Sequence, residues 1–258
     1  MGHDREDTGG GQEEAGEAVR SGPDILSRLA RDPALRDGYF LIDRASPGCG
    51  DPFRTLIATV LSQNTNDRNG YRAFSALDRA VGVRPEALAR APLDAIEDAI
   101  RPAGMYRARA RNIRGIARAV LDRYGGDLSR VLSMDVESAR AALMELPGVG
   151  PKTADVVLLF CASKPTFPVD THIRRVSRRL GLVPPSAGYD RIRRVLQSIF
   201  DPRDYASAHR ALIQLGRVYC RPSRPRCGEC PLRDICPQIG LAGHEKQNRS
   251  PGQPRASQ

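Results

Sequence analysis

Lysine is nearly absent from this chain of 258 residues, although 40 of its side chains are basic. Only three of them are lysines, Lys152, Lys164 and Lys246, and the other 37 are arginines. Arginine keeps its proton and is a poor nucleophile, whereas a lysine amine can lose its proton and attack an electrophile. A side-chain amine nucleophile in this protein would therefore have to be one of three residues.

Long apolar runs are also missing. No stretch of about 18 consecutive apolar residues is present, so the sequence predicts no transmembrane helix. The first residues lack the apolar core of an export signal. In a chain that is not exported, six cysteines favour metal ligation over disulfides. We expect a cytoplasmic protein with no membrane partner.

Charge is distributed unevenly. The first twenty residues hold six acidic and two basic side chains, a charge of −4. Because the whole chain has a net charge of +10, the remaining residues carry +14. A body this basic favours a polyanionic partner such as nucleic acid, although basicity can also serve solubility alone. Residues 1–22, which are acidic, and 241–258 are predicted to be disordered tails because they contain few bulky apolar side chains.

Alternating patterns typical of β-strands are scarce, and apolar residues recur at helical spacing instead. In residues 107–124 they fall one and three positions apart and form a single stripe. The sequence therefore predicts an all-α fold, with helices at residues 52–62, 67–80, 92–101, 107–124, 135–145, 151–162, 171–181, 189–199 and 203–218.

The segment LPGVGPKT, residues 146–153, predicts a turn followed by a helix. Its two glycines leave the turn free of side chains, and its second proline suits the first position of a helix. The free N–H groups of the helix start and the bare glycine backbone would bind a phosphate oxygen. The alternative is an ordinary turn between two core helices. The candidate nucleic-acid contacts are Gly148, Val149, Gly150 and Thr153.

Lys152 lies in the first turn of this predicted helix. The positive end of the helix dipole disfavours a second positive charge, so the pKa of Lys152 should be lowered, which favours a nucleophilic neutral amine. The alternative is a lysine that binds phosphate. Asp170 follows eighteen residues later, in FPVDTHI, where it suits the N-cap of the next helix. Capping N–H bonds would keep its carboxylate ionised.

Four of the six cysteines lie within 17 residues and form the pattern C-x6-C-x2-C-x5-C, which is strong evidence for a metal centre. Four thiolates can hold zinc or an iron–sulfur cluster. Cys49 and Cys161 fit no ligand spacing; we expect Cys161 in the core and assign no role to Cys49. The candidate ligands are Cys220, Cys227, Cys230 and Cys236.

The strings LPGVGPKTADVVL and FPVDTHIRRVSRRLGL, together with the cysteine pattern, resemble the endonuclease III family of helix–hairpin–helix DNA glycosylases. Weaker similarity extends from about Pro23 to Ile239. The resemblance implies that Lys152 attacks C1′ of a damaged nucleotide and forms a Schiff base, aided by the Asp170 carboxylate, and that β-elimination then cuts the strand. It also implies a [4Fe–4S] cluster on the four cysteines.

The same resemblance implies two helical domains with a DNA groove between them. Residues 49–164 would form a six-helix domain that contains the hairpin, and residues 23–48 and 165–240 would form the cluster domain. Lys152 and Asp170 would face each other across the groove. The protein would act as a monomer on damaged duplex DNA, in the cytoplasm at the nucleoid.

In this family a loop with a glutamine fills the gap that the flipped base leaves, and here that loop is residues 61–67. The family string LSAQATD places its glutamine at Asn64, whereas Gln63 lies one position earlier, so both are candidates. Met105 is apolar and would be a second wedge between bases. The alternative for both segments is a plain turn. The arginines of the cysteine loop would contact phosphates: Arg221, Arg224 and Arg226.

Three interpretations compete. The first is a glycosylase with lyase activity that removes oxidised pyrimidines. The second is a monofunctional mismatch glycosylase of the same superfamily, such as one that excises adenine; that branch uses a glutamate in the helix before the wedge loop, and residues 52–62 contain none. The third is a non-catalytic iron–sulfur protein that binds DNA, against which the presence of both Lys152 and Asp170 argues.

Overall fold

The computed structural model describes residues 21–36 and 38–241, and within these ranges it contains helices and no strands. The predicted all-α fold is confirmed. Most of the two expected tails lies outside the described residues. Ser21, Gly22 and Leu241 are exceptions: Ser21 caps the first helix, Gly22 is buried, and the N–H of Leu241 donates to the carbonyl of Gln238 at 3.1 Å. The folded part therefore begins before the predicted boundary at residue 22.

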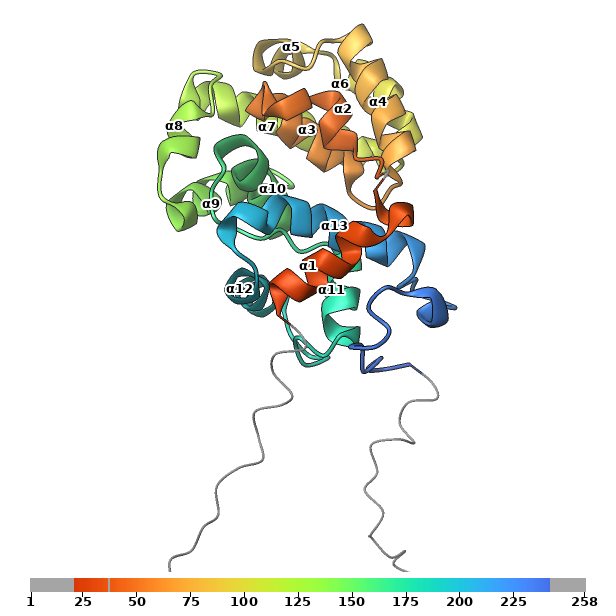
Figure 1. Cartoon of the computed structure of the whole chain (residues 1–258). Coiled ribbons are helices and arrows are strands. Elements are labelled where there is room, and N and C mark those ends of the chain that lie inside the picture. The colour runs from red at the N-terminus through yellow and green to blue at the C-terminus, as the bar shows by residue number, and fades with distance from the viewer. Residues whose placement is uncertain (1–20, 37, 242–258) are drawn as a thin grey trace, which may run out of the picture.

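A first hydrophobic cluster gathers buried residues between Leu41 and Leu158. In Figure 1 most of the helices that supply it form the upper and left part of the molecule, coloured orange to green. They are α2 (Leu41–Ala45), α3 (Pro52–Ser62), α4 (Asp67–Ala80), α5 (Pro85–Arg90), α6 (Leu93–Ile100), α7 (Tyr106–Tyr124), α8 (Ser129–Ser133), α9 (Val136–Met144) and α10 (Pro151–Ala162).

A second cluster joins the two ends of the described chain. The N-terminal helix α1 (Gly22–Arg31) buries Ile25 and Leu29 in this cluster, against helices that come late in the sequence. Figure 1 shows α1 crossing the lower half of the molecule beside them. These later helices are α11 (Thr171–Arg179), α12 (Tyr189–Ile199) and α13 (Tyr205–Val218).

Helix α10 is shared by the two clusters. Leu158 is buried in the first and Leu159 in the second, and a helix that is apolar on most of its circumference is expected to be covered on most sides. Helix α2, which the expected domain division placed with the second unit, packs into the first cluster through Leu41 and Ala45. The division into two domains stays a prediction.

Every predicted helix is present, and its ends lie within two residues of the expected positions. The helices α1, α2, α5 and α8 were not predicted. Helices α2, α5 and α8 have only five or six residues and give no long periodic pattern, whereas α1 has ten residues and its apolar stripe was overlooked next to the acidic tail. Within residues 21–36 and 38–241, no helix is long and apolar enough to cross a membrane.

Candidate active site

A cavity of about 780 Å³ opens where six segments meet: the start of α2, the loop after α3, the starts of α10, α11 and α12, and one side of α13. Its lining combines residues of both hydrophobic clusters with polar side chains. The polar lining residues that matter below are Gln63, Asn64, Asp67, Lys152, Thr153, Asp170, Tyr189, His209 and Arg217.

The hairpin between α9 and α10 supplies one wall of this cavity. Gly148 has φ +73°, and a Cβ on it would lie 2.3 Å from Nδ2 of Asn112, so only glycine fits there. Val149 is buried and anchors the turn in the first cluster. Gly150 is the N-cap of α10 without a side-chain cap, and a Cβ there would meet nothing within 4 Å. This helix start is therefore open to an approaching phosphate.

Lys152 lines the cavity from the first turn of α10. Burial is the main cause that lowers the pKa of its amine, and Arg217 lowers it further; the carboxylates of Asp170 and Asp67 oppose this shift. The direction is the one that the helix position predicted. A lowered pKa increases the fraction of the neutral amine, which is the nucleophilic form.

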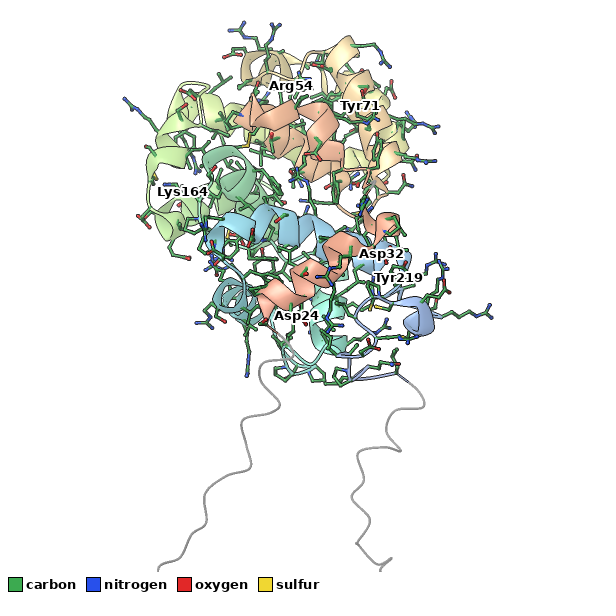
Figure 2. All side chains as sticks on the ribbon, viewed as in Figure 1. Asp24, Asp32, Arg54, Tyr71, Lys164 and Tyr219 are labelled. Atoms are coloured by element: carbon green, nitrogen blue, oxygen red, sulfur yellow. A yellow bond between two sulfur atoms is a disulfide. The ribbon has the colours of Figure 1, made fainter. Side chains whose placement is uncertain are left out.

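The other described lysine has a different environment. Lys164 lies beyond the far end of α10, which begins with Pro151 next to Lys152 and ends at Ala162. Figure 2 places it on the left edge of the molecule, and its amine donates a hydrogen bond to the carbonyl of Met134 at 2.7 Å. Among the described residues, Lys152 is therefore the one lysine in the cavity.

Asp170 lines the same cavity and caps α11, as its sequence position predicted. Its Oδ1 accepts a hydrogen bond from the backbone N–H of Ile173 at 2.8 Å. The structure thus brings Lys152 and Asp170 into one cavity from separate helices. An acceptor carboxylate beside an amine of lowered pKa can stabilise positive charge on a reacting atom between them.

Three further side chains around this pair were missed from the sequence. His209, on α13, is 4% exposed, and its Nδ1–H donates to the carbonyl of Pro168 at 3.0 Å. Burial lowers the pKa of His209 to about 4, so the ring is neutral near pH 7. Tyr189, on α12, and Asp155, on α10, hydrogen-bond each other at 2.6 Å next to the cavity. Asp155 lies within the string LPGVGPKTADVVL but was given no role there, and neither His209 nor Tyr189 belongs to a recognisable local motif.

The candidate wedge residues differ in how they are held. The Gln63 amide donates to the carbonyl of Gly148 and to Oγ1 of Thr153, both at 3.2 Å, so it is tied to the hairpin. Asn64 is exposed, with φ +52°, on the cavity rim. Met105 is 66% exposed, with φ +48°, at the start of α7. The free protein therefore presents Asn64 and Met105, while Gln63 supports the turn.

The four C-terminal cysteines are partly buried, and three of them pack against the second cluster. Burial, together with the neighbouring thiols of Cys236, Cys220 and Cys227, raises the pKa of the Cys230 thiol to about 11. Burial also raises the pKa of the Cys227 thiol, and thiols that resist ionisation on their own fit a centre whose iron supplies the compensating charge. Among the described residues, no three His, Cys, Asp or Glu side chains are placed to hold a single metal ion.

The three arginines of the cysteine loop are exposed, but they are not equivalent. Arg226 forms a bidentate pair with Glu229, which partly neutralises it. The Arg221 side chain donates to the carbonyl of Val218 at 3.1 Å. Arg224 has φ +49° at the tip of the loop. The expected phosphate contacts therefore rest more on Arg221 and Arg224 than on Arg226.

Cys49 and Cys161 form a disulfide across 112 residues of sequence, which links the turn before α3 to the last residues of α10. The expectation that the cysteines favour metal over disulfides is wrong for this pair, and Cys161 is not simply a core residue. Ligand spacing is a local signal, whereas this pairing arises only when the turn packs against α10.

Residues 57–202 match the HhH-GPD superfamily of base excision DNA repair proteins, and residues 220–236 match the iron–sulfur binding domain of endonuclease III. Endonuclease III of Sulfolobus acidocaldarius is 40% identical over 185 residues, which cover 71% of this chain and 81% of the relative. The Thermotoga maritima enzyme is 37% identical over 190 residues, covering 72% and 83%.

Two solved structures align along most of their length. A non-covalent endonuclease III–DNA complex has a TM-score of 0.71 at 30% identity and covers 86% of this chain and 94% of its own. A trapped covalent endonuclease III–DNA intermediate has a TM-score of 0.71 at 31% identity, covering 87% and 95%. Fold and site together define a base-excision DNA glycosylase of the helix–hairpin–helix class that carries an iron–sulfur centre. Within that class, the chain belongs to the endonuclease III family.

Proposed function

We propose that this glycosylase removes oxidised pyrimidines from duplex DNA and then cuts the strand, with Lys152 as the nucleophile. The observation that carries the proposal is the amine of Lys152, partly buried at a helix start, with a lowered pKa, in one cavity with the Asp170 carboxylate. An amine with a lowered pKa is more often neutral, and a neutral amine can attack an electrophilic carbon.

The proposed reaction begins at the Lys152 amine. The Lys152 amine attacks C1′ of the extruded nucleotide, a C–N bond forms, and the electron pair of the glycosidic bond leaves with the base. The Asp170 carboxylate stabilises the positive charge that C1′ gains as this bond breaks. The sugar opens to a Schiff base, C2′ loses a proton, and β-elimination expels the 3′ phosphate.

DNA binding would use the hairpin and the two turns. The open start of α10 at Gly150 would hold a phosphate by backbone N–H groups, which fixes register without reading sequence. Asn64 would occupy the space of the flipped base, and Met105 would enter the stack from its own turn. The protein would act as a monomer at the nucleoid, in the cytoplasm, and its basic arginines would attract the phosphate backbone.

The preference for damaged pyrimidines has a physical basis. Such bases lose planarity and stack poorly, so extrusion costs less than the few kcal/mol of an intact base. Excision of an intact adenine needs an acid near the base, and residues 52–62 of α3 contain no Glu or Asp. Competition in one tube between thymine glycol opposite adenine and adenine opposite 8-oxoguanine tests this choice. Faster release of adenine would favour a mismatch glycosylase.

Borohydride trapping tests the nucleophile. Wild-type protein should become covalently linked to an oligonucleotide with an abasic site, and Lys152→Ala should lose the link together with at least on the order of 10³-fold in base excision. Lys164→Ala is the matched control, because its amine faces Met134 instead of the cavity. Robust trapping by Lys152→Ala would assign the chemistry to another amine. Asp170→Asn should bind damaged DNA but excise slowly.

A further inference from the structure

The hydroxyl of Tyr189 touches both elements that carry the proposed catalytic pair. It lies 2.6 Å from Oδ2 of Asp155, which is three residues after Lys152 on α10. It also accepts a hydrogen bond from the backbone N–H of Val169 at 3.3 Å, the residue directly before Asp170. Tyr189 itself belongs to neither element, because it is the first residue of α12.

The direction of both hydrogen bonds is fixed by chemistry. A backbone N–H can only donate, so Val169 supplies the proton of its bond and the phenol oxygen accepts. The single phenol proton of Tyr189 is then free for the Asp155 carboxylate. Burial first, and then the neighbouring Asp155, raise the pKa of Tyr189, so the phenol keeps this proton over the whole physiological range.

Asp155 cannot turn away from the phenol. It is 0% exposed, and its other oxygen, Oδ1, accepts from Oγ1 of Thr166 at 2.8 Å and lies 3.2 Å from Nε of Arg140. Arg140 in turn pairs with Asp190 at 2.7 Å. Both carboxylate oxygens are therefore engaged. Tyr189 thus forms a bridge of two hydrogen bonds between Asp155 and Val169, and the end of this bridge on α10 is rigid.

The turn before Asp170 is held from a second side. The buried His209 ring donates to the carbonyl of Pro168, while Tyr189 receives the N–H of Val169. Removing the Tyr189 hydroxyl would therefore loosen this turn without releasing it. The Tyr189 side chain also lines the cavity together with Lys152 and Asp170, so the loosening would act directly at the site.

We propose that Tyr189 is a positioning residue of this glycosylase. Through Asp155 and the N–H of Val169 it fixes the distance between the Lys152 helix and the Asp170 turn, and so keeps the amine and the carboxylate aligned on C1′. The proposal rests on the roles proposed above for Lys152 and Asp170. Since a displacement of about 1 Å at a reacting centre can cost about 10²-fold in rate, one lost hydrogen bond at this place is measurable.

Tyr189→Phe keeps the ring and removes only the bridge. We expect single-turnover excision and borohydride trapping to slow about 10- to 100-fold, with the affinity for the damaged duplex unchanged. Tyr205→Phe is the matched control, because it removes a 2.8 Å phenol–carbonyl bond in the same hydrophobic cluster away from the cavity. Its rates should equal those of wild type.

A second measurement does not depend on activity. The Val169 amide should exchange its hydrogen faster in Tyr189→Phe than in wild type, because its acceptor is gone.

Three results would overturn the proposal: wild-type excision by Tyr189→Phe, an equal loss in Tyr205→Phe, or a loss confined to DNA affinity. Failure of the proposed function would look different. Wild-type protein would then form no covalent link to abasic DNA, whatever residue stands at position 189.

Discussion

The buried guanidinium of Arg109 donates a hydrogen bond to the backbone carbonyl of Gln63, 46 residues earlier in the chain. Its other terminal nitrogen donates to both carbonyls of the 103–104 turn, at 2.7 and 3.0 Å. The side chain is 5% exposed, and burial lowers its pKa. One cation therefore fixes the turn of Asn64 relative to the turn of Met105, and the two proposed wedges are expected to act together.

Arg109→Lys should uncouple these wedges, because one ammonium cannot reach all three carbonyls with the geometry of the guanidinium fork. Excision of a damaged base should slow about tenfold, or about 1.4 kcal/mol. Strand cleavage at a preformed abasic site should slow less, since no base remains to be extruded. Both rates are measured under single turnover, with the exposed Arg107→Lys as control. Equal losses on both substrates would contradict the coupling.

The rate of excision should depend on pH through Lys152. Its pKa is lowered by burial, and the protonated amine has no lone pair. The rate is therefore lost as pH falls through the lowered pKa, and it reaches its plateau below the value of about 10.4 for an ordinary lysine. Single-turnover rates from about pH 5 to about pH 10 test this. A rate that still rises near the upper end of this pH range would mean that the pKa of the Lys152 amine is not lowered.

His209 should make the protein sensitive to acid. Its pKa is about 4 in the folded state against an ordinary 6.5, so between these values the unfolded chain binds more protons. Stability is therefore lost as pH falls through this window, by up to about 3 kcal/mol. Urea unfolding at about pH 7 and about pH 5 measures the loss. His209→Gln keeps a donor for Pro168 and should show a weaker dependence; an unchanged slope would exclude His209 as the cause.

The four C-terminal cysteines should hold about four irons per chain. Cys230→Ser should lower the iron content. It should also destabilise the second hydrophobic cluster, because Cys230 packs against it and binding of the iron–sulfur centre is coupled to folding. Iron and zinc analysis of protein prepared without oxygen is the measurement. Stoichiometric zinc without iron would contradict a [4Fe–4S] centre.

The disulfide between Cys49 and Cys161 closes a loop of 112 residues. Loop-closure entropy predicts that Cys49→Ser lowers the free energy of unfolding by up to about 5 kcal/mol. Cys161→Ser should have the same effect, and the double variant should lose nothing more, because either change removes the same bond. Thermal unfolding with and without a thiol reductant gives the comparison. A reductant effect that persists in Cys49→Ser would mean that another group is being reduced.

Most of the candidate site residues could be predicted from local sequence motifs. The turn around Gly148 and Gly150, the helix start at Lys152 and the cap at Asp170 are set by neighbours in sequence, so their chemistry could be predicted from short strings. The resemblance implied that Lys152 and Asp170 face each other across a groove. The structure places both in the lining of one cavity, and their catalytic roles stay a prediction.

The residues that surround this pair could not be predicted in the same way. Tyr189 and His209 reach the 168–170 turn from helices that begin 20 and more residues later, and only tertiary packing brings them there. Nothing in their own sequence windows distinguishes them from ordinary core residues. The pairing of Cys49 with Cys161 was not predicted for the same reason. The expectation that cysteines of a chain that is not exported bind metal does not say which thiols become neighbours in the fold.

The placement of α1 has a consequence for synthesis on the ribosome. The apolar stripe of α1, with Ile25 and Leu29, is translated first, but its partners lie almost entirely between Leu159 and Ile235. The first cluster can collapse as soon as its segments have left the exit tunnel, while α1 stays undocked until nearly the whole chain has been translated. Docking of α1 therefore reports that α12 and α13 have been translated, and a chain truncated before these helices would expose this stripe to chaperones and proteases.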